Sequence, residues 1–525
     1  MAYNVYLIVG ASIALSLGYA FWRLLPVPLP GLPHFPESTK RMFGDGPTVK
    51  GMGQRTREPS AAVFALCRNL GSPVVQFLLT SITTPSIVID DPREVEDILL
   101  RRNKEFDRSE LTTHLFSQIL PHSTLAQLTT PALKAQKRLW SDVMHPDFLR
   151  RVVAPNLQTA ARELVELWTL KAERAGAGQS FDVSEDFQST ALDAIWVAVL
   201  GSKIGVLRLE MARLRGQEMD GSETARLVEV VRFAVEKGSS IINAGVGSLW
   251  PALTYFFMSL TPSYRRFKRI GHDEVQKIMT RACDRFHRLS EASSSGGREE
   301  GEGDSEHDTC AMDFVLRREI MTAKKEGKPA PDPTRDPAML DELWLIAILE
   351  ADIPILDATI EETARCSATA AITTRRALVD TEVLGHRIPA GTNVLLNLRI
   401  RDEPFEVDES CRSATSQTAQ SKRTRGGFDG PSGRELDRFE PRRWLAQDNK
   451  GNEVFDAYSL PALTFGGGFR GCFGKRLAML EIRIIIATLM LNFEFLPLPA
   501  ELSSLGAEET VFRKPLTVHV NLKPL

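Results

Sequence analysis

The sequence predicts a mainly α protein with a small β part, behind one apolar N-terminal helix. Three observations predict this class. Hydrophobic residues make up 43% and charged residues 25% of the 525 residues, which is ordinary globular usage. Several long stretches carry apolar residues at helical spacing, whereas β-branched runs are few and short. Residues 1–22 contain no charged side chain.

Net charge and cysteine content exclude two other classes. The chain has 64 basic and 67 acidic residues, a net charge of −3, whereas a nucleic-acid binder usually carries a basic excess. We therefore expect no nucleic-acid partner. Six cysteines in 525 residues are too few for a disulfide-dense secreted scaffold.

The N-terminus predicts a membrane anchor. Val5–Trp22 is a run of 18 mostly apolar residues, and a helix needs about 20 to span the hydrocarbon core. The first basic residue, Arg23, follows this run, which predicts a cytosolic position for the bulk of the chain. We expect a transmembrane anchor over residues 1–25, in contact with a lipid bilayer. The alternative, a cleaved signal peptide, usually has a basic start and a shorter apolar core.

The next segment predicts a stiff connector. Pro26–Pro36 holds five prolines in eleven residues, which favours an extended hinge over residues 26–37. The remaining residues, 38–525, are then expected to form one large domain.

The elements of this domain follow from local patterns. Pro85–Asp90 is a β-branched run and predicts a strand. Pro92–Arg102 predicts a helix with Val95, Ile98 and Leu99 on one face. Helical periodicity also covers residues 132–149, 155–172, 191–200 and 264–289.

Three polar segments predict loops that interrupt the domain. Residues 291–309 are low in complexity, acidic and poor in apolar side chains. Residues 323–337 are rich in Lys, Pro and Asp, and residues 410–435 are rich in Ser, Thr, Arg and Gly. Their composition favours insertions into one domain over linkers between domains.

The segment Phe465–Gly474 (FGGGFRGCFG) predicts a thiolate ligand to a large flat cofactor. Glycines let the backbone approach the cofactor face, and backbone N–H groups keep a thiolate ionised. A helix predicted over residues 475–491 adds its positive end beside Cys472. Arg470 is suited to binding an anionic group at the cofactor rim. A buried structural Cys in a Gly-rich turn is the alternative.

This segment resembles the heme-binding signature of the cytochrome P450 monooxygenases, F-x-x-G-x-R-x-C-x-G. Every fixed position is met, by Phe465, Gly468, Arg470, Cys472 and Gly474. The resemblance implies a cytochrome P450-like domain with heme b, whose iron Cys472 binds. It also implies NADPH-derived electrons from a membrane-bound flavoprotein reductase, an apolar small-molecule substrate, and the endoplasmic reticulum membrane.

Other family motifs agree. Glu362–Arg365 matches the family's E-x-x-R motif, and Arg443 lies in a segment similar to its F-x-P-x-R-F. The resemblance implies that these three residues form a buried structural network that supports the Cys loop.

Two further cofactor contacts are implied by the resemblance. Arg375 (or Arg376) corresponds to a heme-propionate contact. Lys137 lies where the family usually has W-x-x-x-R, with Leu133 in place of the Trp and Lys137 in place of the Arg.

One family feature is absent from the sequence. The family's central helix carries an A/G-G-x-D/E-T-T motif that delivers protons to bound dioxygen. Here such a helix begins at Met339–Leu349 but runs into Glu350–Pro354. Residues 341–350 would give only about 15 Å of helix, too short to cross a heme. We therefore expect an internal deletion near 349–355 and assign no catalytic residue beyond the heme ligand.

Three explanations of this deletion stay open: a gene model that lacks an exon, a decaying gene, or a real variant without oxygen-activating machinery. The predicted function is monooxygenation of an apolar small molecule, with secondary metabolism as an expectation by family analogy. One alternative is a reductase-independent heme-thiolate isomerase or dehydratase. The other is a catalytically impaired heme-binding pseudoenzyme.

Overall fold

A computed structural model gives the fold of the chain. It describes residues 2–270, with gaps at 82, 141, 146–147, 177, 202–203, 218–222, 247 and 249–250, then single positions up to 284, Cys310, Asp313, and residues 354–418 and 435–525 except 505. The predictions for residues 291–309, 323–337 and 339–349, and for most of 410–435, lie outside the described residues. The chain divides into two compact units.

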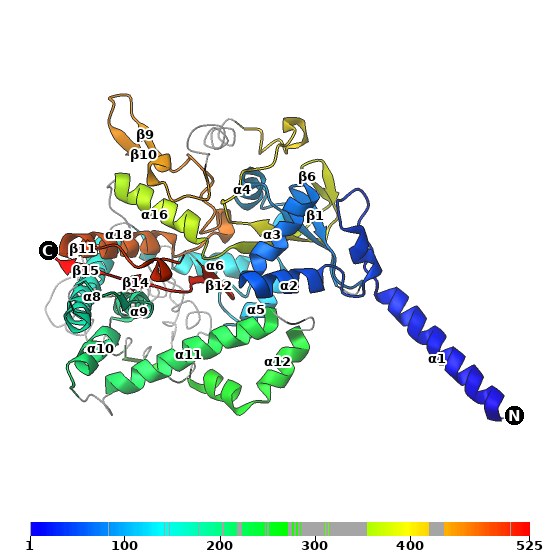
Figure 1. The fold of residues 1–525 in the computed structure, drawn as a ribbon, viewed down its shortest axis with the longest axis horizontal. Helices are drawn as coiled ribbons and strands as arrows, with labels where there is room; N and C mark the ends of the chain where they lie inside the picture. The colour runs from blue at the N-terminus through cyan, green and yellow to red at the C-terminus, as the bar shows by residue number, and fades with distance from the viewer. Residues whose placement is uncertain are drawn as a thin grey trace, which may run out of the picture. The chain divides into compact units, whose positions relative to one another are not determined.

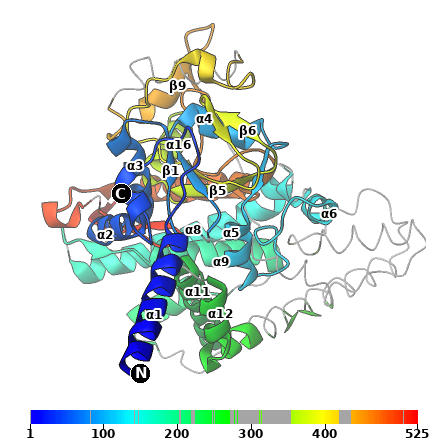
Figure 2. The ribbon, with the colours of Figure 1, turned by 90° about the vertical axis from the view of Figure 1, so that its right-hand side faces the viewer.

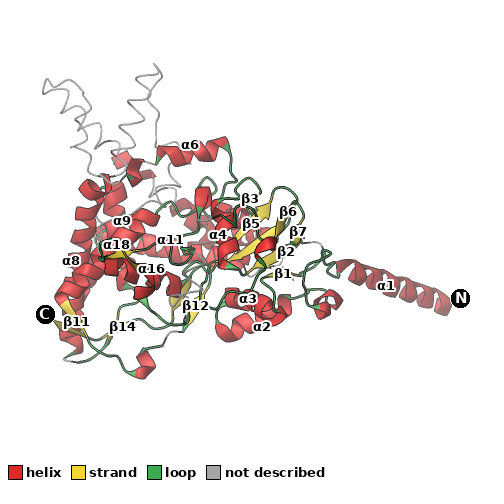
Figure 3. Ribbon diagram, turned by 90° about the horizontal axis from the view of Figure 1, so that it is seen from above, coloured by secondary structure: helices red, strands yellow, loops and turns green. Residues whose placement is uncertain are grey.

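The first unit comprises residues 1–111, 361–471 and 507–514. Its helices are α1 (Ala2–Leu24), α2 (Gly46–Thr56), α3 (Pro59–Leu70) and α4 (Pro92–Leu100). Its main strands are β1 (Val74–Phe77), β2 (Ser86–Ile89), β3 (Phe106–Arg108), β5 (Ile372–Ala377) and β8 (Asn393–Asn397). They form one sheet in the order β1-β2-β8-β5-β3, in which only β2 and β8 run parallel. Strands β1, β2, β3 and β5 of this sheet are labelled in Figure 3.

Helix α3 covers this sheet. Val63, Phe64 and Leu66 of α3 are buried against Val88 and Leu395 of the central strands, and α2 packs beside α3 (Figure 1). The strand predicted at Pro85–Asp90 and the helix predicted at Pro92–Arg102 are confirmed as β2 and α4. Burial of these apolar faces is the main stabilising contribution to the unit.

Short hairpins complete the first unit. They are β6 (Thr381–Val383) with β7 (His386–Ile388), β9 (Leu445–Gln447) with β10 (Glu453–Phe455), and β12 (Ala507–Glu509) with β13 (Arg513–Pro515). In the β6–β7 turn, Leu384 and Gly385 both have positive φ, +48° and +78°, which is the geometry of a tight two-residue hairpin.

The second unit comprises residues 112–360, 472–506 and 515–525. Its helices are α6 (Pro131–Leu139), α8 (Ala154–Ala175), α9 (Asp186–Leu200), α10 (Val206–Leu214), α11 (Glu223–Val246), α12 (Pro251–Ser259) and α18 (Lys475–Asn492). Two helices, α5 (Glu110–Ser117) and α16 (Pro354–Ser367), cross the division between units. Its strands are β4 (Phe181–Asp182) with β14 (His519–Val520), and β11 (Phe493–Phe495) with β15 (Leu522–Pro524).

Helix α8 organises the second unit. It packs against α9, α10 and α18, and its buried Leu164 and Trp168 join Leu489 and Phe493 of the C-terminal segment in one core cluster. Helices α11 and α12 lie side by side (Figure 2). The helices predicted at residues 155–172, 191–200 and 475–491 are confirmed as α8, α9 and α18.

One predicted helix is interrupted. Residues 132–149 carry helical periodicity, but α6 ends at Leu139 and only a short 3₁₀ turn, Asp142–Met144, follows. The basic stretch predicted at 264–289 begins as a helix over residues 262–270.

The N-terminal prediction needs a correction. The apolar run is helical, as α1. Within the described residues, however, no helix combines the length and the apolar character that crossing a bilayer requires. A spanning anchor over residues 1–25 is therefore not supported by the structure.

The Pro-rich segment is tied to the sheet. The side-chain amide of Gln76 on β1 donates to the carbonyls of Leu29 and Leu32 at 2.9 and 3.1 Å and accepts from the N–H of Leu29 at 2.7 Å. One buried glutamine therefore holds the middle of this segment against the first unit.

Candidate active site

The Gly-rich turn before Cys472 packs against the end of α4. Gly466 and Gly468 have φ of +64° and +62°, a region that side chains rarely adopt. A Cβ on Gly468 would lie 2.3 Å from the carbonyl oxygen of Leu99, and one on Gly467 would lie 2.7 Å from a methyl of Leu100. At Gly468 the chain therefore requires glycine, because the turn approaches the backbone of α4 so closely, whereas at Gly467 the end of the Leu100 side chain would have to move.

Cys472 lies just before α18, whose N-cap is Gly474. Removal of water by the surrounding atoms raises the pKa of the Cys472 thiol, although the residue remains accessible to solvent. The backbone N–H of Gly474, the positive charges of Lys137 and Lys475 and the N–H of Lys475 act in the opposite direction and lower its pKa. The thiol thus lies in a partly enclosed recess where every polar influence favours the thiolate.

Lys137 acts on Cys472 from α6. It lies in the last turn of that helix, and its charge favours an ionised sulfur. The sequence-based prediction for Lys137 rested on a weak match to W-x-x-x-R, yet within the second unit the structure brings Lys137 near Cys472.

Three arginines gather in the first unit with a single carboxylate. Arg108 on β3 and Arg375 on β5 are directly opposite each other across the strand pair, and like charges at such positions repel. Arg470, in the turn before Cys472, is 6% exposed and pairs with Asp107 at 3.1 Å. The cluster therefore holds three positive charges against one negative charge.

The pKa values of Arg108 and Arg375 are both lowered in this cluster. Burial, followed by the charges of Arg470 and Arg375, lowers the pKa of Arg108 to about 9. Burial and the charge of Arg470 lower the pKa of Arg375 to about 10. Both groups stay protonated at neutral pH, so the cluster is suited to attracting an anionic ligand.

The neighbouring Arg376 differs from Arg375. Its side chain is 36% exposed and forms an ion pair with Glu110. Of the two residues that the sequence left open, the structure brings Arg375 into the arginine cluster and leaves Arg376 at the surface.

A second charged group surrounds Glu362, whose carboxylate is fully hydrogen-bonded. Arg365 donates to both carboxylate oxygens of Glu362, at 2.7 and 2.8 Å, and Arg443 donates at 3.0 Å. The indole N–H of Trp444 and the backbone N–H of Glu440 complete the shell at 2.9 and 2.8 Å. Burial acts against the charge of Glu362, but these donors outweigh it and lower its pKa.

The remaining site residues have simpler positions. Phe465 is half-buried, and Gly468 begins the 3₁₀ turn that carries Arg470. Sequence reasoning missed Arg108, because a lone Arg at the end of a three-residue strand carries no pattern of its own. The role of Arg108 depends on its position opposite Arg375, which can be recognised only when β3 is placed in register with β5.

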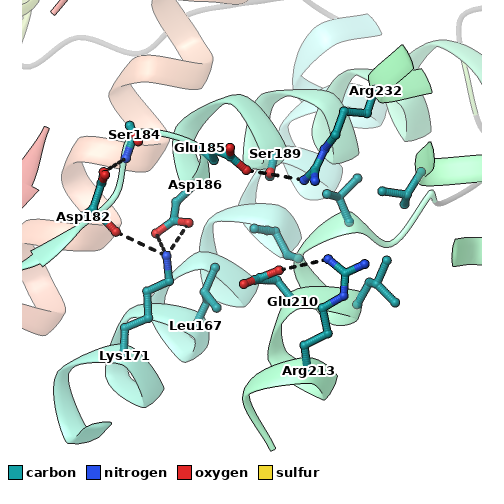
Figure 4. A pocket seen from close by; sticks show the side chains of 14 residues that line it. Leu167, Lys171, Asp182, Ser184, Glu185, Asp186, Ser189, Glu210, Arg213 and Arg232 are labelled. Atoms are coloured by element: carbon teal, nitrogen blue, oxygen red, sulfur yellow. Dashed lines mark hydrogen bonds and ion pairs between the residues drawn. The ribbon is translucent and has the colours of Figure 1, made fainter. Parts of the chain in front are cut away.

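Another cleft, of about 240 Å³, lies among α8, α9, α10 and α11 (Figure 4). Its charged side chains neutralise one another: Lys171 pairs with Asp186 at 2.7 Å, Arg232 with Glu185 at 3.4 Å, and Arg213 with Glu210 at 3.6 Å. This cleft therefore lacks the unbalanced charge of the arginine cluster. Within the described residues, no group of three or more His, Cys, Asp or Glu side chains is arranged to hold a metal ion.

Comparison with known proteins identifies the class to which this fold and site belong. The family model of the cytochrome P450s matches residues 45–327, 350–400 and 436–520. The chain belongs to the cytochrome P450 family, and the resemblance drawn from the sequence is confirmed. Family membership implies a heme iron, a redox-partner reductase and a small-molecule substrate.

Individual relatives are similar over nearly their full length. The chain is 28% identical to the cytochrome P450 monooxygenase TRI13 of Fusarium sporotrichioides, over 97% of each chain. It is 27% identical to the cytochrome P450 monooxygenase GME11363 of Pestalotiopsis microspora, over 99% of this chain and 98% of the relative. It is 28% identical to the cytochrome P450 monooxygenase xilC of Penicillium rubens, over 94% and 92%.

The chain does not align with the family model and its relatives at every position. Residues 328–349 are unmatched by the family model. The alignment with TRI13 runs over 591 positions, more than the 525 residues of this chain, so the relative has residues where this chain has none.

Proposed function

We propose that this protein is a heme-thiolate monooxygenase that oxidises an apolar small molecule in fungal secondary metabolism. The observation that carries the proposal is Cys472, a solvent-accessible thiol beside the start of α18 whose polar neighbours all favour the thiolate. The family membership and the monooxygenase names of the relatives support it.

The donor set fits a heme. Cys472 would supply the thiolate that such an iron requires, and two anionic propionates would relieve the repulsion among like charges that helps to lower the pKa values of Arg108 and Arg375. We infer that Arg108, Arg375 and Arg470 would hold the propionates, while Phe465, Gly468 and Gly474 shape the loop that presents the sulfur. When bound, the heme supplies the oxygen-activating chemistry, and the protein supplies binding and electrostatics.

The chain's own residues then have separate tasks. Lys137 and the N–H groups of Gly474 and Lys475 oppose the effect of burial and lower the pKa of the Cys472 thiol, which favours the thiolate that an iron would bind. Glu362, Arg365 and Arg443 hold the segment around residues 436–444 in place without contacting substrate. Electrons would come from NADPH through a flavoprotein reductase.

The experiment that tests the proposal is a spectrum of the reduced, CO-bound holoprotein. We predict a thiolate-type Soret band for the wild type and its complete loss in Cys472→Ala. Cys366→Ala is the matched control, since Cys366 is also an exposed free thiol, and it should keep the band. A Cys472→Ala protein with an unchanged thiolate-type band would overturn the proposal.

A heme-thiolate isomerase or dehydratase is the second candidate. The unmatched residues 328–349 favour it, because the proton-delivering motif would lie in this interval and the sequence has no such motif. Rearranging an already oxygenated substrate requires neither reductase nor proton relay. Turnover of a hydroperoxide without NADPH would support this candidate, and heme binding without turnover in either assay would indicate a pseudoenzyme.

The internal deletion has its own test. Sequencing the transcript across Leu349–Ile355 distinguishes a gene model that lacks an exon from a real deletion. An additional in-frame segment with the G-x-D/E-T-T motif would favour the monooxygenase. A transcript that reads straight through would favour the isomerase or pseudoenzyme.

Membrane attachment at the endoplasmic reticulum is a further part of the proposal. Its support is the apolar run of α1, in which Leu15, Leu17 and Trp22 are 75%, 65% and 63% exposed. Membrane fractionation of the full chain and of a chain lacking residues 1–25 tests it. Recovery of both in the soluble fraction would contradict it.

A further inference from the structure

Residues 408–417, which we call the clasp, hold the N-terminal end of α4. Arg412 of the clasp donates two parallel hydrogen bonds to the carboxylate of Asp91, both at 2.9 Å. Asp91 is the N-cap of α4 and accepts from the backbone N–H of Glu94 at 2.7 Å. The clasp therefore binds the residue at which α4 begins, in a bidentate geometry that fixes both distance and orientation.

The clasp also holds the sides of α4. Arg93, in the first turn, is 3% exposed and donates to both carboxylate oxygens of Glu409, at 2.9 and 3.1 Å. Ser413 and Thr415 both donate to the same oxygen of Asp97, at 2.7 and 2.8 Å. Three separate attachments along nine residues leave α4 little freedom to shift or rotate.

The opposite end of α4 contacts the turn before Cys472. The carbonyl of Leu99 and the side chain of Leu100 lie where a Cβ on Gly468 or Gly467 would collide. Because the turn and α4 approach so closely, no space is left between them. A displacement of α4 along its axis would therefore displace the turn. Only three residues lie between Gly468 and Cys472 along the chain.

We propose that the clasp is a positioning device for the Cys472 loop, acting through α4, and that Arg412 is its principal positioning residue. The proposal rests on the proposed heme-thiolate function. Buried ion pairs add little net stability compared with apolar packing but require one geometry, which suits a positioning role. The clasp lies within residues 401–435, which the family model leaves unmatched, so it is outside the shared family pattern.

The test uses full-length holoprotein and two readouts, the thiolate-type band of the reduced CO complex and the reduction potential of the heme iron. Arg412→Gln removes both bonds to Asp91, and we expect it to lose about half of the thiolate-type band and to shift the potential. Arg412→Lys restores the charge without the bidentate geometry and should recover only part of the band. Arg387→Gln is the matched control, because its ion pair with Asp380 is exposed, and it should change neither readout.

A milder variant keeps the test decisive if Arg412→Gln fails to fold. Ser413→Ala with Thr415→Val removes only the two hydroxyl donors to Asp97 and should shift the same readouts by a smaller amount. Unchanged band and potential in folded, heme-loaded Arg412→Gln, or in the double variant if the first does not fold, overturn the proposal. A wild type without a thiolate-type band would instead overturn the proposed function itself.

Discussion

Two buried groups of charges in the first unit differ in how they are balanced. Around Glu362, every strong donor faces an acceptor: burial opposes the charges, yet the partners lower the pKa of Glu362 and raise that of Arg365. In the arginine cluster, burial and mutual repulsion lower the pKa values of Arg108 and Arg375. The donors around Glu362 are matched by acceptors within the protein, whereas the like charges of the arginine cluster repel one another, and under the proposed function an anionic ligand would stabilise them.

The difference separates a structural role from a binding role. A hydrogen-bonded network in the interior whose carboxylate is fully satisfied holds segments together and has no acceptor left for a ligand. Like charges held close together in the interior destabilise the fold, and such a cost persists where function requires it. The way in which the charges meet their partners, rather than the residue types, is thus what distinguishes the two groups.

The largest effect is expected from breaking the balanced group. Glu362→Gln leaves Arg365 and Arg443 as buried cations without their counter-charge, and breaking a buried pair costs about 3–5 kcal/mol. We expect the free energy of unfolding in urea to fall by that amount. Glu435→Gln is the control, because its ion pair with Arg438 is exposed, and it should change stability by less than about 0.5 kcal/mol. Equal effects of the two substitutions would contradict a supporting role for Glu362.

The next effect concerns a buried carboxyl group whose pKa is raised by burial. Glu481 on α18 is 7% exposed, its Oε1 has no hydrogen-bond partner, and burial raises its pKa to about 7. Because the raised pKa favours the protonated form, the stability that Glu481 contributes is fully present below its unfolded pKa of about 4.5. It is lost as pH rises through about 7.

Glu481→Gln should remove this pH dependence. The neutral amide keeps the shape of the protonated acid, so the variant should match the wild type at pH 5 and exceed its stability at pH 8. The gain is at most about 3 kcal/mol, since each pKa unit corresponds to about 1.4 kcal/mol. Thermal unfolding at both pH values measures it, with Glu494→Gln as an exposed control. A wild-type stability that does not fall between pH 5 and 8 would argue against a buried neutral acid.

The sequence alone was sufficient to predict the parts of this protein that depend on local patterns. One short segment contains Arg470, Cys472 and the glycines. Glu362 and Arg365 are three residues apart on one helix. The spacing of both motifs can therefore be recognised in the sequence. The helices α8 and α18 carry an apolar stripe long enough to be predicted.

What sequence reasoning missed depends on contacts between distant segments. Strands β5 and β8 are short, and their pairing becomes apparent only from the sheet. Arg108 gains its meaning from Arg375, more than 250 residues later, through the register of β3 with β5. The clasp was read as a polar insertion from its composition, because its arginine and hydroxyl donors acquire partners only when α4 lies beside them.

The smallest effect in stability, and the sharpest test of the comparison, comes from Arg375. Arg375→Gln removes one of three like charges, so the apoprotein should be at least as stable as the wild type in urea, the opposite of Glu362→Gln. The same substitution should weaken heme binding about tenfold, which corresponds to about 1.4 kcal/mol. Arg376→Gln is a control one residue away, whose exposed ion pair with Glu110 predicts no change in heme affinity. Titration of apoprotein with heme, followed by absorbance, measures both. Stability and heme affinity that fall together in Arg375→Gln would mean that Arg375 is structural in the way Glu362 is, and the distinction between a balanced network and a ligand-completed cluster would fail.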